Sequence, residues 1–225
     1  MKRLGILFAC FAILASAVCA ETSRKTLVTR FESCEAIIRE FQANAETQIP
    51  AEVLKQAKGI IITNQVKGGF IFGMRYGYGV VLVRQADGSW SIPVLIRAGE
   101  TSLGLQIGGN TIETVYIITD AQTPKLLFAD RLNIGVDANA VYGPRAADVE
   151  KLNRELLNTP VLVYAKGKGL YAGATVKTGW ISRNDEDNFT FYQTQNALPE
   201  LLYSNWVQPP AEVQPLINYI GEITK

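Results

Sequence analysis

Glycine alternates with larger side chains along three segments of the chain, and no other feature limits the possible folds as much. In segment 67–79, an extended backbone would place large side chains on one face and glycines on the other: Phe70, Phe72, Met74, Tyr76 and Tyr78 against Gly69, Gly73, Gly77 and Gly79. The pattern recurs at 103–108 and 169–176. A strand with a bare glycine face bends sharply or lets a ligand or another backbone come close. Three such strands predict a sheet that coils strongly or partly closes into a barrel.

Short runs with a period of two residues extend through the middle of the chain. The expected strands are residues 60–64, 69–76, 80–85, 90–97, 102–107, 111–119, 161–165, 170–178 and 180–183. Turn signals such as Asp87-Gly88 separate neighbours, and short strands joined by short turns favour antiparallel pairing. The sequence therefore predicts an α+β fold: a predominantly antiparallel, strongly coiled sheet or partly closed barrel, with an N-terminal amphipathic helix and a C-terminal helix.

The N-terminal helix is expected over residues 21–44, because apolar side chains recur there at spacings of three and four. They are Leu27, Phe31, Cys34, Ile38 and Phe41. Two roles are open for this helix: it covers the core, or it meets a membrane surface or a partner. Further helices are expected over residues 50–58, 146–157 and 211–223, and a polar turn over residues 185–188.

The first 20 residues have the features of a signal peptide. Lys2 and Arg3 precede an apolar run at 4–18, and small residues up to Ala20 predict cleavage before Glu21. The sequence therefore predicts a periplasmic or secreted chain, with lipidation at Cys19 as the alternative. Residues 21–225 then form a single domain, divided into an N-terminal helical segment (21–58), a β-rich core (59–193) and a C-terminal segment (194–225).

Charge and composition exclude several functions. Without its leader the chain keeps 20 of its 22 basic residues against 21 acidic ones, a net charge of −1, which gives no field for nucleic-acid binding. The chain has no histidine, which removes the usual catalytic triads and histidine-ligated zinc. No glycine motif has the context of a phosphate-binding loop. We therefore expect no catalytic residue, metal or cofactor, and keep a two-carboxylate envelope hydrolase as a minor alternative.

Cations beside glycines form the candidate binding site. Lys58, Lys67, Lys166 and Lys168 each lie next to a glycine at an expected strand or helix end, where small neighbours leave the ammonium and nearby amides open to an anion. Arg75 joins them if the glycine face is exposed, and Lys177 lies at a strand end. The alternative is that these lysines only solubilise turns. With aromatic residues nearby, the pattern favours a polyanionic headgroup and hence an anionic phospholipid or membrane surface as the partner.

Several short motifs, in order along the chain, resemble the SYLF domain family, a group of lipid- and actin-binding modules that includes exported bacterial-type members. The matching positions run from Ile49 to Tyr203: Ala57-Lys58-Gly59, Gly68-Gly69-Phe70, Gly77 with Gly79, Asp87-Gly88-Ser89-Trp90-Ser91 with Pro93, Gly104 to Gly109, Gly135 with Asp137, Gly143-Pro144, and Tyr164 with Lys166 and 168–173. The resemblance implies phospholipid binding without catalytic activity. Actin binding is not expected of an exported chain, and a structural or protein-binding module of the cell envelope is the alternative function.

Overall fold

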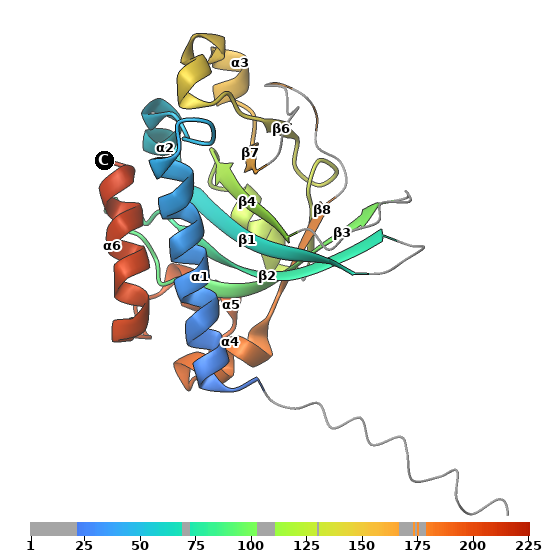
Figure 1. Cartoon of the computed structure of the whole chain (residues 1–225). Helices are drawn as coiled ribbons and strands as arrows, with labels where there is room; N and C mark the ends of the chain where they lie inside the picture. Colours follow the sequence, from blue (N-terminus) through green and yellow to red (C-terminus); the bar gives the residue numbers. More distant parts are fainter. Residues whose placement is uncertain are drawn as a thin grey trace, which may run out of the picture.

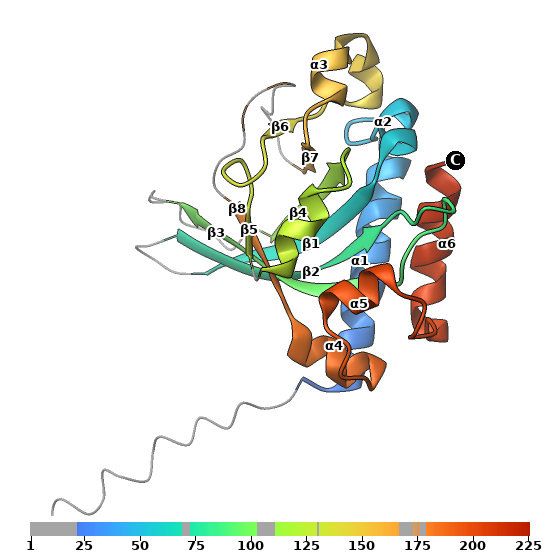
Figure 2. The same ribbon diagram turned by 180° about the vertical axis from the view of Figure 1, so that it is seen from behind.

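The computed structural model of the chain describes residues 22–68, 73–102, 111–129, 131–166, 173, 175 and 179–225, with the backbone alone at 66–68, 73–75 and 100–102. These residues form an eight-stranded sheet, curled into a half-barrel and flanked by helices on both sides (Figures 1 and 2). None of the helices in the described ranges has the length and apolar character needed to cross a membrane.

The sheet has the strand order β5-β8-β3-β2-β1-β4-β7-β6. Its strands are β1 (Gly59–Gly68), β2 (Gly73–Val83), β3 (Val94–Ser102), β4 (Thr111–Ile118), β5 (Arg131–Asn133), β6 (Ala140–Tyr142), β7 (Val161–Ala165) and β8 (Gly179–Arg183). Every pair of neighbours is antiparallel except β6 and β7. The predicted α+β fold with a coiled, predominantly antiparallel sheet is confirmed.

Two glycines of β2 let its backbone lie close against that of β1. A Cβ atom at Gly77 would lie 2.1 Å from the carbonyl oxygen of Asn64, and one at Gly79 would lie 2.3 Å from that of Ile62. Both oxygens belong to the backbone of β1, so neither can move aside as a side chain would. The bare face predicted for this segment is therefore a place where two backbones approach closely.

Helices cover the two faces and the ends of the sheet. They are α1 (Arg24–Ala43), α2 (Ala51–Gln56), η1 (Thr123–Phe128), η2 (Ala146–Lys151), α3 (Arg154–Leu157), α4 (Asp185–Tyr192), α5 (Leu198–Tyr203), η3 (Ala211–Val213) and α6 (Gln214–Ile223). In Figure 1, α1 crosses the face nearest the viewer with α6 beside it, and Figure 2 shows α5 on the opposite side. The core therefore lies on both faces of the central strands.

The apolar stripe of α1 is buried against the sheet. Its buried residues are Leu27, Phe31, Cys34, Ile37, Ile38 and Phe41, each at most 3% exposed. Burial of an aliphatic or aromatic side chain contributes about 1.5–3 kcal/mol, so the five such residues of α1 contribute roughly 8–15 kcal/mol, as an upper estimate. That figure equals the whole stability of many domains. The sequence left two roles open for this helix, and in the structure it covers the core.

Burial also decides the state of the single cysteine in the described part of the chain. Cys34 is fully buried, and its thiol approaches the carbonyl oxygen of Ile62 at 3.8 Å. Desolvation raises the pKa of the thiol from 9.0 to about 12. The side chain is a core residue, as its place in the helical stripe predicted.

Three local predictions were wrong. The two strands expected at 69–76 and 80–85 form, from Gly73 to Val83, the single strand β2, because Gly77 and Gly79 remain paired with β1. The helix expected over 146–157 is interrupted, and the Asn153 side chain accepts a hydrogen bond from the Leu156 N–H to begin α3. The polar turn expected at 185–188 is the first turn of α4, where acidic residues are favourable. The strands expected at 102–107 and 170–178 lie almost entirely outside the described residues.

Candidate functional site

The strand register brings three of the predicted cations to one end of the sheet. Lys67 of β1 and Arg75 of β2 are directly paired, and the N–H of Lys166, just after β7, donates to the Glu113 carbonyl at 3.2 Å. Through Glu113 of β4, Lys166 is level with Asn64 of β1, three residues before Lys67, so the three cations lie toward the same end of the sheet. We call Lys67, Arg75 and Lys166 the cationic rim. The side chains of Lys67 and Arg75, and all of Lys168 and Lys177, lie outside the described residues.

Lys166 lies between two carboxylates. Its Nζ atom is 2.7 Å from Oε2 of Glu40 on α1 and also pairs with Glu113 of β4, and it lies 5.8 Å from the centre of the Phe41 ring. Burial lowers the pKa of the ammonium, but hydrogen bonds and charge interactions with Glu113 and Glu40 outweigh it, so the pKa rises. Lys166 therefore stays charged and links α1 to the sheet.

The two carboxylates differ in exposure. The Glu40 side chain is 61% exposed and that of Glu113 is 22% exposed. An exposed ion pair contributes little, since water and salt screen it. An incoming anion can therefore displace Glu40 from Lys166 more readily than it can displace Glu113.

Lys58 lies at the other end of β1, away from the rim. Its N–H donates to the Ile118 carbonyl at 2.7 Å, and its carbonyl accepts from the Arg84 N–H at 2.8 Å. The Arg84 guanidinium donates to the last carbonyls of two helices, those of Lys55 at 2.9 Å and Thr224 at 2.7 Å. A cation suits these positions because helix C-termini carry partial negative charge. The structure thus separates Lys58 from Lys67, Arg75 and Lys166.

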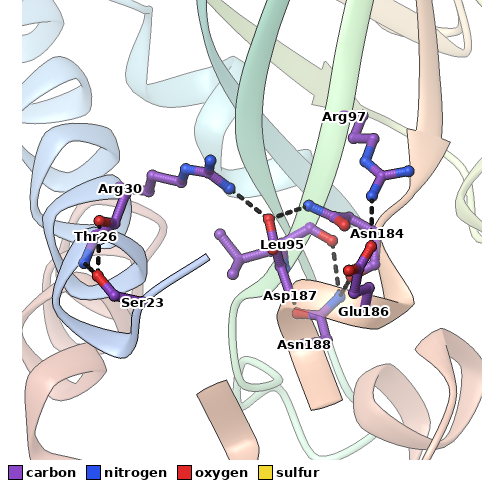
Figure 3. Close-up of polar contacts among 9 residues, drawn as sticks. All are labelled: Ser23, Thr26, Arg30, Leu95, Arg97, Asn184, Glu186, Asp187 and Asn188. Carbon is purple, nitrogen blue, oxygen red and sulfur yellow. Dashed lines mark hydrogen bonds and ion pairs between the residues drawn. The ribbon is translucent and has the colours of Figure 1, made fainter. Parts of the chain in front are cut away.

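A polar network fixes the N-terminal half of α1 to α4 (Figure 3). The Arg30 guanidinium pairs with the Asp187 carboxylate, which also accepts from the Asn184 amide at 2.5 Å. Asp187 is buried, with 8% of its side chain exposed. Removing one member of such a pair leaves the other charge poorly compensated. The helix is therefore held at this end by a polar network as well as by apolar packing.

The neighbouring Asn188 binds the backbone of β3. Its side chain accepts from the Leu95 N–H and donates to the Leu95 carbonyl, both at 2.8 Å (Figure 3). Sequence reasoning missed this role because it assigned the segment to a turn. Three acidic residues before apolar Phe189 and Phe191 form a helix-start pattern that could have revealed α4.

The described carboxylates near the strand ends are engaged in ion pairs and hydrogen bonds with other side chains or with the backbone. Glu113 and Glu40 both contact Lys166, and Asp137 accepts from the N–H and the side-chain amide of Asn133, at 2.7 and 2.9 Å, inside a turn. Within the described ranges, no group of three or more potential metal-binding side chains comes together. The Asp130 side chain and that of Glu100 lie outside the described residues.

Comparison with known proteins adds independent information. A profile of the family described as "Ysc84: Las17-binding protein actin regulator" matches residues 99–223. LAS seventeen-binding protein 3 of Saccharomyces cerevisiae is 31% identical over 180 residues, which cover 78% of this chain and 39% of that protein. SH3 domain-containing YSC84-like protein 1 of Rattus norvegicus is 28% identical over 195 residues, which cover 84% of this chain and 57% of that protein. The chain thus spans less than two thirds of the length of these relatives.

Proposed function

The chain belongs to the Ysc84 family, also known as the SYLF domain family, and we propose that it is a non-enzymatic module that binds anionic phospholipid headgroups through its cationic rim. The family description links the Ysc84 domain to Las17 and to actin regulation. For this chain we favour an anionic lipid, because residues 1–20 have the pattern of an export signal and an exported protein is separated from actin.

The proposal is supported by the placement of Lys67, Arg75 and Lys166 toward one end of the sheet. Cationic residues near an anionic membrane surface contribute about 1 kcal/mol each. Lys168 follows Lys166 by two residues and Lys177 lies in the same connection before β8, so both belong to the proposed site on sequence grounds. A headgroup phosphate would take the place of the exposed Glu40 carboxylate beside Lys166.

The test removes charge from the rim. We make one triple variant that carries Lys67→Gln, Lys166→Gln and Lys168→Gln. It should bind phosphatidylglycerol vesicles roughly a hundredfold more weakly, since three contacts of about 1 kcal/mol are lost. Binding of the unmodified chain should also weaken as salt rises. Co-sedimentation at several vesicle concentrations measures both effects, and the melting temperature checks that the variant folds.

A matched control removes three charges near the Lys58 end of the sheet. Lys55, Lys125 and Lys225 are exposed, and they lie in or next to segments that contact Arg84 or Gly59. Changing all three to glutamine should leave vesicle binding within about threefold of the unmodified chain, because screening limits distant charges. A hundredfold loss in this control, with the rim variant unchanged, would move the site to the Lys58 end.

A substitution at Glu40 is expected to strengthen vesicle binding, whereas the rim variant weakens it. Glu40→Gln frees Lys166 from one partner, so we expect about fivefold tighter vesicle binding, which corresponds to about 1 kcal/mol. Glu32→Gln is the control, because Glu32 is exposed on the same helix and carries the same charge. Equal gains in the two variants would show a general charge effect and no competition at Lys166.

Export is the other part of the proposal. A basic start, an apolar run and a small-residue end over residues 1–20 support cleavage after Ala20, which would deliver the chain to the periplasm or the medium. Mass spectrometry of the chain recovered from a bacterial host should give Glu21 as its first residue. An intact or lipid-modified N-terminus would contradict this cleavage.

A further inference from the structure

A second candidate site lies apart from the cationic rim. A cleft of about 740 Å³ opens between the turn after β2 and the loop after α5. Residues 85–92 and 203–209 form its walls, and Gln214 and Ile217 complete the lining. This volume falls within the ~300–1,000 Å³ that is usual for small-molecule sites. Of the residues proposed for lipid binding, Lys58 and Lys166 are fully described, and neither lines the cleft.

The cleft presents an aromatic face to solvent. Trp206 is 70% exposed, and Tyr203 at its edge is 40% exposed. The Ser204 hydroxyl donates to the Glu200 carbonyl at 2.6 Å and accepts from the Trp206 N–H at 3.3 Å, while Val207 packs against the core. The loop is therefore held in place although its indole is open, which leaves apolar area for a ligand to cover.

The polar side chains of the cleft include a carboxylate, amides, hydroxyl groups and the Trp206 indole, so the cleft offers acceptors as well as donors. Oδ1 of Asp87 accepts from the hydroxyl and the N–H of Ser89, at 2.6 and 2.9 Å, and these bonds lower the pKa of the carboxyl. Asp87 Oδ2 has no partner among the described residues. Gln85 Nε2 donates to the Leu202 carbonyl at 2.6 Å, which leaves the Gln85 amide oxygen available as an acceptor. Neither lysine nor arginine occurs among the described residues that line the cleft.

This lining discriminates between classes of ligand. An anionic headgroup would meet a carboxylate with no cation to offset it. A proline-rich peptide offers mainly carbonyl acceptors, because proline has no N–H, so the oxygens of Asp87 and Gln85 would stay unmatched. A sugar has hydroxyl groups that donate as well as accept and a C–H face that packs on an indole ring.

We propose that the cleft binds a neutral oligosaccharide, with Trp206 packed under one sugar ring and with Asp87 and Gln85 accepting hydrogen bonds from sugar hydroxyls. A cleft of this size, with one exposed indole and several planar polar side chains, provides both kinds of contact. The site is independent of the cationic rim, so the chain would engage glycan and lipid through different surfaces.

The experiment is titration calorimetry with maltotriose, cellotriose and triacetylchitotriose on the chain without residues 1–20. We expect at least one of them to bind, and Trp206→Ala to weaken that binding at least about tenfold. Asp87→Asn should also weaken it. The control Tyr76→Ala removes another exposed aromatic side chain, 54% exposed on β2 and outside the cleft, and should bind sugar normally.

Several results would overturn the proposal. One is no binding by any of the three sugars at about 10 mM, where even weak sites fill. Another is equal affinity in Trp206→Ala and the unmodified chain. A shift of tryptophan fluorescence that is lost in Trp206→Ala, seen with an oligoproline peptide or with neutral phosphatidylcholine vesicles and not with sugar, would assign the cleft to a protein or a membrane instead. The rim variant should keep its sugar binding, which separates this test from that of the lipid site.

Discussion

Gly77→Ala should destabilise the domain by about 3 kcal/mol or more, the range of severe overpacking in a core. The reason is geometric, because the new methyl group would lie 2.1 Å from the Asn64 carbonyl oxygen and 2.7 Å from the Gln65 Cα atom. Relieving these contacts requires β1 and β2 to separate, which breaks the pairing at the centre of the sheet. Urea unfolding followed by circular dichroism measures the loss.

Gly221→Ala is the matched control. Gly221 lies inside α6, and apart from its chain neighbours and the backbone of its own helix no heavy atom of the described residues lies within 4 Å of the position that its Cβ would take. Alanine is the better helix former, so this variant should gain about 0.5–1 kcal/mol. The same substitution is thus expected to lower the free energy of unfolding at Gly77 and to raise it at Gly221. A Gly77→Ala variant as stable as the unmodified chain would show that the two backbones do not approach this closely.

Phe31→Ala should cost about 3–5 kcal/mol of unfolding free energy, the usual loss for a buried phenylalanine. Phe31 is 1% exposed, and its ring lies 4.5 Å from that of Phe191 and 6.3 Å from that of Tyr192. The variant therefore leaves a cavity where α1 meets α4. Denaturant unfolding should show a lower midpoint, while Glu32→Ala, on the exposed side of α1, should stay within about 0.5 kcal/mol.

This prediction also distinguishes the two roles first considered for α1. If the helix were free to lie on a membrane, Phe31→Ala would leave stability unchanged and weaken vesicle binding. The structure predicts the reverse, because the contacts of Phe31 are all within the folded domain. A stable variant that no longer binds vesicles would contradict the docked helix.

The coiled sheet and α1 were predictable because each depends on a local pattern. Glycines two residues apart in β2 have a direct structural consequence, and apolar residues every three or four positions in α1 form one buried stripe. The register that pairs Lys67 with Arg75 and separates both from Lys58 was not predictable. It depends on which strands become neighbours, and glycine-flanked lysines look alike in a sequence whichever end of a strand they occupy.

The polar network under α1 was missed for a related reason. Asp187 and Asn188 lie in an acidic run typical of a solvated turn, and their burial depends on Arg30 and Leu95, more than 90 residues away in the chain. The cleft around Trp206 likewise joins two segments separated by more than 100 residues. Composition can indicate such residues, but only tertiary structure brings them together.

The two hydrogen bonds between Asn188 and Leu95 have a consequence for solubility. β8 pairs with β3 from Ile96 onward, so Leu95 lies just beyond the reach of its neighbour strand. An unpaired N–H and carbonyl at such a place can recruit a strand from another molecule. The Asn188 amide supplies the donor and the acceptor that a passing strand would otherwise bring. One buried side chain thus satisfies the backbone groups that a strand from another molecule would otherwise pair with, where β8 is too short to do so.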